Sequence, residues 1–183
     1  MRIRYLFFFV FTLLFWGQPA FAQQNKIVFL ILDGIPAQDL ERVATPNLDQ
    51  IASQGGYSRA YTGGLAGGYS ESPTISAVGY NTLLTGTWAH KHQVWGNGIK
   101  APNYQYWTIF RYLREVRPDA KVAIFSTWQD NRTKLLGENL PQTNFLRLNQ
   151  SLDGLELDTL RYPHDSQSDY IHRIDQRVAE EAA

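Results

Sequence analysis

Asp33 follows directly after a continuous apolar run. Lys26 is followed by six consecutive apolar residues, and Asp33-Gly34 closes the run. Such a run, rich in β-branched residues and without alternation, is typical of a strand covered on both faces of a parallel sheet. Ligands bind at the carboxyl ends of such strands, where a carboxylate can ligate a cation. Asp33 is therefore a candidate metal ligand. The alternative is that it caps the following turn, because Asp-Gly is common in turns.

A second group of reactive side chains lies between residues 70 and 86, where a loop rich in Gly and Ser leads into a helix pattern with several hydroxyls. A hydroxyl at the start of a helix is well placed for nucleophilic chemistry, because the free N–H groups and positive potential there attract anions. A nearby dication would lower the pKa of that hydroxyl. The alternative is that the hydroxyl residue only caps the helix.

Two histidines, His90 and His92, follow soon after that helix. Side chains two residues apart point the same way only on an extended segment, so both could bind one metal ion only there. The alternative is that they pack inside the loop.

The elements that must position these residues alternate between strands and helices. Helix patterns cover 45–55, 73–86, 104–116, 129–136 and 166–183, and strand patterns cover 26–32, 57–61, 121–126 and 145–148. The first helix is expected to begin with Thr45 as its cap and Pro46 at its first position, where a missing N–H costs nothing. This alternation predicts an α/β fold with a mostly parallel sheet flanked by helices.

The first 22 residues have the pattern of a cleaved signal peptide. Arg2 and Arg4 precede an apolar run over 5–16, and Ala20-Phe21-Ala22 matches the small-x-small cleavage signal. The apolar run is shorter than the about 20 residues that span a bilayer, although an N-terminal membrane anchor is the alternative. We therefore expect cleavage after Ala22, one domain over 23–183, and no membrane association after cleavage.

The amino-acid composition indicates the cellular compartment and the kind of partner to expect. The chain has no cysteine, and export without disulfides favours a bacterial periplasm, with secretion as the alternative. The formal net charge is zero, which argues against a nucleic-acid-binding surface. The sequence carries no indication of oligomeric state.

The order and spacing of these motifs resemble the nucleotide pyrophosphatase/phosphodiesterase branch of the alkaline phosphatase superfamily. The matching elements are Asp33-Gly34 after an apolar strand, Thr45-Pro46-Asn47-Leu48, a hydroxyl six residues before Thr82-Leu83-Leu84-Thr85-Gly86, and His92 six residues after Gly86. The resemblance implies an alkaline-phosphatase-like fold and a site with two zinc ions. Asp33 would ligate one ion, and Ser76 would be the metal-bound nucleophile. Thr74 is the alternative nucleophile if the loop before the helix aligns with the family motif in a different register.

The implied activity is hydrolysis of a small phosphate ester, either a phosphodiester or a nucleotide pyrophosphate, through a phosphoseryl intermediate. Gly79 stands where many family members have an asparagine that helps to hold a phosphoryl oxygen, so Asn81 is the substitute candidate. The related sulfatases are disfavoured, because the chain lacks cysteine and has Val78 and Tyr80 in place of the sulfatase Pro and Arg.

The family's further zinc ligands come from an Asp-x3-His, an Asp-His pair and a late His. The late aspartates Asp165, Asp169 and Asp175 have no histidine four residues on. The resemblance therefore implies an incomplete, amino-terminal part of a catalytic domain, with negligible turnover of its own. The alternative is a non-catalytic exported binding domain with the same fold.

Overall fold

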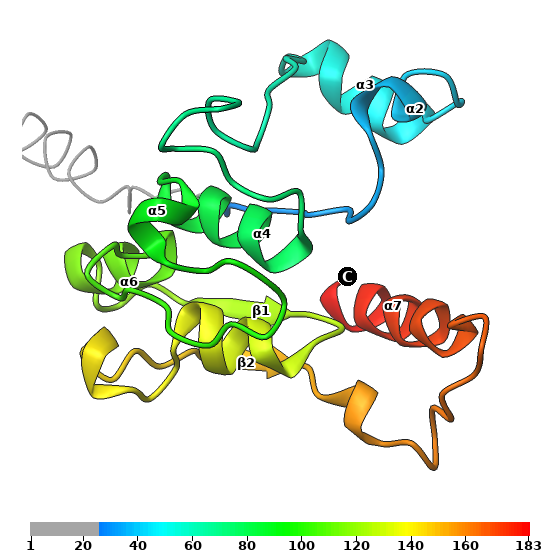
Figure 1. Ribbon diagram of the computed structural model, residues 1–183. Helices are drawn as coiled ribbons and strands as arrows, with labels where there is room; N and C mark the ends of the chain where they lie inside the picture. The colour runs from blue at the N-terminus through cyan, green and yellow to red at the C-terminus, as the bar shows by residue number, and fades with distance from the viewer. Residues whose placement is uncertain (1–25) are drawn as a thin grey trace, which may run out of the picture. The chain divides into compact units, whose positions relative to one another are not determined.

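The computed structural model describes residues 26–183 (Figure 1), and the expected signal peptide lies outside the described residues. Two units are distinguished, one ending at Leu32 and the other running from Asp33 to Ala183. The second unit holds every helix and strand discussed below.

The second unit contains the following helices and strands. Its α-helices are α2 (Ala37–Leu40), α3 (Pro46–Gln54), α4 (Ser76–Thr85), α5 (Ala89–His92), α6 (Ile109–Val116) and α7 (Asp169–Ala182). Its strands are β1 (Ala123–Phe125) and β2 (Gln150–Leu152), a π-helix spans Asn131–Leu136, and 3-10 turns span Pro141–Thr143 and Leu155–Leu157. Among the described residues, none of the helices combines the length and the apolar character needed to cross a bilayer.

The two strands pair in parallel, side by side in Figure 1, with Ile124 opposite Ser151. Parallel strands need a long crossover connection between them, and here that connection contains the π-helix. The fold is therefore α/β with parallel pairing and flanking helices, as the sequence predicts.

The strand predicted over 26–32 does not form. These residues have no regular secondary structure, and their apolar side chains are exposed, with Ile27 and Val28 at 90% and 89%. An apolar run becomes a strand only when neighbouring strands pair with it and cover it, and in the described part of the chain β1 and β2 pair only with each other. The prediction of a short strand over 57–61 is wrong for the same reason, and Tyr61 in that segment is 76% exposed.

The last strand lies later than the sequence predicts, at β2 rather than at 145–148. Asn144 and Phe145 both adopt positive φ, which is turn geometry that interrupts a strand. The N–H of Phe145 donates to the carbonyl of Leu140, so this segment folds back on the preceding turn. Pairing with β1 then begins at Gln150, in a polar segment without a strand pattern.

The predicted helices form, with shorter bounds in places. Pro46 opens α3 as expected, but the Thr45 hydroxyl donates to Asp49 instead of capping the helix. The helix expected from Tyr104 begins only at Ile109, where the Thr108 side chain caps it.

Helix α4 is fixed by a small apolar core. Ala77 and Val78 on α4 pack with Ala89, Val94, Ile99 and Leu135, and Tyr80 packs against this cluster. Gly86 ends the helix in the left-handed conformation, with φ of 65°, where glycine carries no steric cost. The core thus holds the start of α4, where the predicted nucleophile lies.

Candidate active site

Asp33 and Ser76 are in contact. The Ser76 hydroxyl donates a hydrogen bond of 2.8 Å to Asp33 Oδ2, although 43 positions separate the two residues. Asp33 sits in a turn completed by Gly34, whose φ is 72°, and Ser76 is the first residue of α4. Asp33 is exposed and Ser76 is partly exposed, so a ligand from solvent can reach both side chains. The two residues that the sequence singled out for chemistry therefore share one site.

The first turn of α4 is capped by a residue outside the helix. Ile75 occupies the cap position and offers no side-chain acceptor. Asn97, from the loop after α5, accepts a 3.1 Å hydrogen bond from the N–H of Ala77 through its side-chain oxygen. The Asn97 amide therefore lies at the helix end that carries Ser76, with its NH2 group as a potential donor. Asn97 does not stand out in the sequence, because Gly96-Asn97-Gly98 has the pattern of an ordinary turn.

The two weaker candidates occupy different places. Thr74 is exposed and precedes the helix by two residues, and the hydroxyl that contacts Asp33 belongs to Ser76. Asn81 is 3% exposed within α4, and its side-chain oxygen is buried without a partner among the described residues. Asn81 is thus part of the helix packing, whereas Asn97 lies at the helix start.

Tyr80 adds a phenol to the pair. It lies one helical turn after Ser76 and packs against the core under the start of α4. Burial raises the pKa of Tyr80, and the Asp33 carboxylate raises it further, so the phenol keeps its proton at neutral pH. In the sequence, Tyr80 stands out only as a departure from the sulfatase pattern.

His92 is a buried structural histidine. Its Nδ1 accepts the N–H of Val94 at 3.1 Å, so Nε2 carries the proton and donates to the Thr82 hydroxyl, also at 3.1 Å. Burial, together with nearby His90, lowers the pKa of His92 to about 4. With both ring nitrogens engaged, His92 links α4 to α5 and has no free nitrogen for a metal ion.

His90, His164 and two of the late acids also have structural partners. His90 meets the Tyr69 ring edge-on, and His164 contacts the carbonyl of Glu156. The Asp165 carboxylate accepts N–H groups at the start of α7, and these hydrogen bonds hold its pKa below its usual range. Asp175 on α7 is hydrogen-bonded to Thr127, which follows β1.

Within residues 26–183, no three His, Cys, Asp or Glu side chains gather closely enough to hold a metal ion. A carboxylate oxygen is an ordinary zinc ligand, and Asp33 offers one beside the Ser76 hydroxyl. These two donors are fewer than the three or four protein ligands that zinc sites have.

Comparison with known proteins is consistent with this geometry. The family model described as Type I phosphodiesterase / nucleotide pyrophosphatase matches residues 27–143, which is more than half of the chain. The chain belongs to this family. The match confirms the resemblance drawn from the motifs and places the chain in the alkaline phosphatase superfamily. The matched segment contains Asp33, Ser76, Tyr80 and Asn97. No curated protein and no solved structure matches the chain significantly.

Proposed function

We propose that this phosphodiesterase-family chain carries the nucleophile of a zinc-dependent phosphoric-ester hydrolase, with Ser76 as the nucleophile and Asp33 as its partner and metal ligand. The family match supports phosphodiester or pyrophosphate hydrolysis as the reaction class. The observation that carries the assignment is the 2.8 Å hydrogen bond between Ser76 and Asp33 at the start of α4. The proposed substrate is a small phosphate ester.

In the proposed reaction, Ser76 Oγ forms a bond to phosphorus while the bond from phosphorus to the leaving oxygen breaks. The hydroxyl proton points to Asp33, which is the acceptor nearest to it. The N-terminus of α4 and the Asn97 amide supply positive potential and a hydrogen-bond donor for the phosphoryl oxygens. Water then attacks the phosphoseryl group, releases phosphate or a phosphate monoester, and returns Ser76 to its hydroxyl form.

Zinc, when bound, supplies positive charge that favours the ionised Ser76 oxygen and balances the charge on the phosphoryl group. Asp33 and Ser76 would hold it. Because three or more protein ligands are usual, we expect the 183-residue chain alone to bind zinc weakly and to turn over slowly.

The test therefore looks for the intermediate rather than for turnover. The chain is incubated with zinc and bis-p-nitrophenyl phosphate, quenched in acid, and mapped by mass spectrometry. We expect a nitrophenyl-phosphoryl group on Ser76 in the wild type and in Thr74→Ala, and none in Ser76→Ala. An adduct on another residue, or no adduct on Ser76, would contradict the assignment. Sustained turnover that Ser76→Ala abolishes would show that the 183 residues suffice for catalysis.

We also propose that the chain is exported to the periplasm, or secreted, after removal of residues 1–22. The charged start, the apolar run and the Ala20-Phe21-Ala22 signal support this proposal. Expression in a bacterium followed by N-terminal sequencing of the periplasmic product is expected to give a chain that begins at Gln23. Retention of Met1 on a membrane-bound product would instead indicate an anchor.

A further inference from the structure

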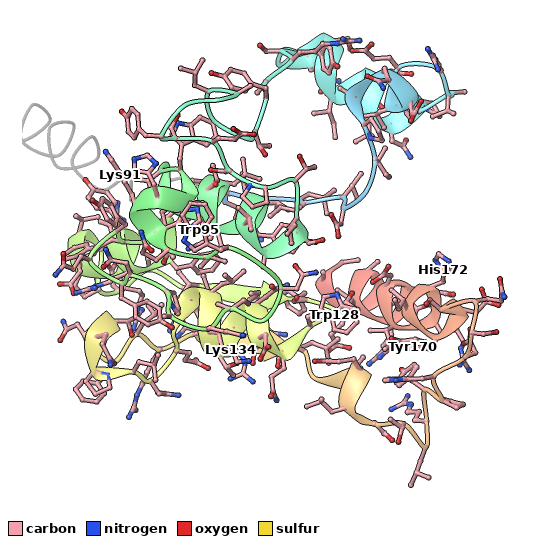
Figure 2. The ribbon with its side chains drawn as sticks, in the orientation of Figure 1. Lys91, Trp95, Trp128, Lys134, Tyr170 and His172 are labelled. Atoms are coloured by element: carbon pink, nitrogen blue, oxygen red, sulfur yellow. The ribbon has the colours of Figure 1, made fainter. Side chains whose placement is uncertain are left out.

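A tight turn holds Asn97 against the start of α4. The N–H of Ile99 donates to the carbonyl of Gly96 at 3.1 Å, which closes a β-turn directly after Trp95 (labelled in Figure 2). Asn97 and Gly98 are the two central residues of this turn, and both are exposed. Ile99, by contrast, is only 5% exposed in the core cluster that also packs α4. The core therefore fixes the turn in place while its central residues stay open to water.

The two central residues can react with each other. They form the only Asn-Gly pair in the sequence. A glycine after asparagine lets the next main-chain nitrogen approach the side-chain amide carbon, because no Cβ stands in the way. The nitrogen of Gly98 donates no hydrogen bond to any of the described residues, so no such contact has to break before it approaches. The turn thus holds a free nitrogen next to an amide carbon.

The helix polarises the side-chain carbonyl of Asn97. Its oxygen accepts the N–H of Ala77 at 3.1 Å, at the positive end of the α4 dipole. Attack on the amide carbon puts negative charge on this oxygen, and a donor already aimed at the oxygen stabilises that charge, as in an oxyanion hole. The contact that caps α4 therefore also favours attack on the Asn97 amide.

We propose that Asn97 is a site of spontaneous covalent modification, at which the folded chain exchanges an amide for a carboxylate. The nitrogen of Gly98 forms a bond to Asn97 Cγ while the bond from Cγ to Nδ2 breaks. The proton of the attacking nitrogen leaves with Nδ2 as ammonia, and a succinimide ring remains. Water then opens the ring at either of its carbonyl carbons, which gives aspartate or isoaspartate.

The new carboxylate would lie at the start of the helix that carries Ser76. Aspartate keeps an oxygen for the N–H of Ala77, but it lacks the NH2 donor and repels a phosphoryl group. Isoaspartate also routes the main chain through an extra carbon, in a turn that buried Ile99 holds in place. The modification itself is independent of the proposed function, whereas its effect on Ser76 rests on that function. The expected consequence is an irreversible loss of Ser76 reactivity as the molecule ages.

The test compares the wild type with Gly98→Ala, which places a Cβ on the attacking residue. That Cβ would contact only the flexible stem of Lys100, at 3.8 Å, so the fold and the contact between Asn97 and Ala77 should remain. Both chains are stored at mildly alkaline pH, folded in buffer and unfolded in urea. Position 97 is then mapped by mass spectrometry, with Asp-N cleavage to distinguish aspartate from isoaspartate.

We expect the folded wild type to convert at least as fast as the unfolded wild type, because only the folded chain has the Ala77 donor in place. The added Cβ should slow conversion in Gly98→Ala by about tenfold or more. Slower conversion of the wild type when folded than when unfolded would show that the fold protects Asn97 and would overturn the proposal. Equal conversion of the two folded chains would overturn it as well.

A second readout separates this inference from the proposed function. Anion exchange separates the modified wild type, which carries an additional negative charge, from the unmodified wild type. Both fractions are incubated with zinc and bis-p-nitrophenyl phosphate. We expect the Ser76 adduct to form about tenfold more slowly or less in the modified fraction, because a donor to the phosphoryl oxygens is lost. Equal rates would overturn the effect on Ser76. If the unmodified fraction forms no adduct, the proposed function fails, and the mapping of position 97 alone decides on the modification.

Discussion

The Ser76 hydroxyl donates to Asp33 Oδ2 from the first turn of α4. This contact joins a residue with low intrinsic reactivity to a carboxylate that can accept its proton or share a cation with it. The contact does not depend on a buried environment, because Asp33 is exposed and Ser76 is only partly buried. We therefore expect the contact to raise the reactivity of Ser76 through the negative charge of Asp33. A substitution can remove this charge and keep the hydrogen bond.

Asp33→Asn makes that separation. The amide keeps an oxygen that can accept from Ser76, but it removes the negative charge. We expect formation of the Ser76 adduct to slow by at least about 100-fold, the lower range for loss of a proton acceptor. The rate is measured by quenching at increasing times and quantifying the modified peptide.

Asp39→Asn is the control for net charge. Asp39 is an exposed acid that pairs only loosely with Arg42, at 3.6 Å. Its substitution should leave the adduct rate unchanged, and both variants should unfold within about 0.5 kcal/mol of the wild type. Equal slowing in the two variants would mean that general charge, and not the Asp33 contact, matters.

Asn97 is predicted to act on both stability and reactivity. Asn97→Ala removes the acceptor for the N–H of Ala77 and should lower the free energy of unfolding by about 1 kcal/mol, as lost helix caps do. Asn97→Asp keeps the acceptor and should keep the stability in urea denaturation. Its carboxylate would repel the phosphoryl group, so the Ser76 adduct should form more slowly in Asn97→Asp despite intact folding. Normal adduct formation in that variant would exclude Asn97 from the site.

The sequence singles out two residues that the structure places in contact, whereas it predicts the sheet poorly. Asp33 and Ser76 stand at a spacing that resembles the family motif, and their side chains are hydrogen-bonded in the structure. By contrast, 26–32 was assigned to a strand because it is apolar, but strand formation depends on partners that local sequence does not specify. The pairing of polar Gln150 with Ala123 illustrates the same limit. Asn97 is not recognisable from the sequence, because only the fold shows that its side chain reaches the start of α4.

His92 should make the protein less stable in mild acid. Its pKa is about 4 in the folded chain and near 6.5 when unfolded. Above pH 6.5 both states are neutral and the stability is at its full value. As the pH falls from 6.5 towards 4, only the unfolded state gains the proton, so stability falls by up to about 1.4 kcal/mol per pH unit.

The measurement is urea denaturation at pH 7.5 and at pH 5. His92→Gln should be less stable than the wild type at pH 7.5, because it loses the links to Thr82 and Val94, and its loss of stability on acidification should be smaller. The control is His172→Gln, since His172 projects into solvent from α7 (Figure 2) and should keep the wild-type pH dependence. A wild-type pH dependence in His92→Gln would show that His92 does not titrate in this window.

Arg132 is predicted to be the most important ion-pairing residue for folding in the unit from Asp33 to Ala183. Its guanidinium contacts Asp153 at 2.6 Å and Glu138 at 2.7 Å, and the side chains of these acids are only 3% and 12% exposed. Arg132→Met keeps the aliphatic volume but leaves two carboxylates buried without a cation. We expect the free energy of unfolding to fall by about 3 kcal/mol at pH 7, as when one partner of a buried pair is removed.

Lys134→Met is the matched control, because Lys134 (labelled in Figure 2) lies near Arg132 in the chain. It pairs with Asp130 at 2.7 Å, and both side chains are at least 40% exposed. An exposed pair of this kind contributes less than about 1 kcal/mol, so this variant should unfold close to the wild type. Equal losses of stability in the two variants would mean that burial of the two carboxylates is not what makes Arg132 important.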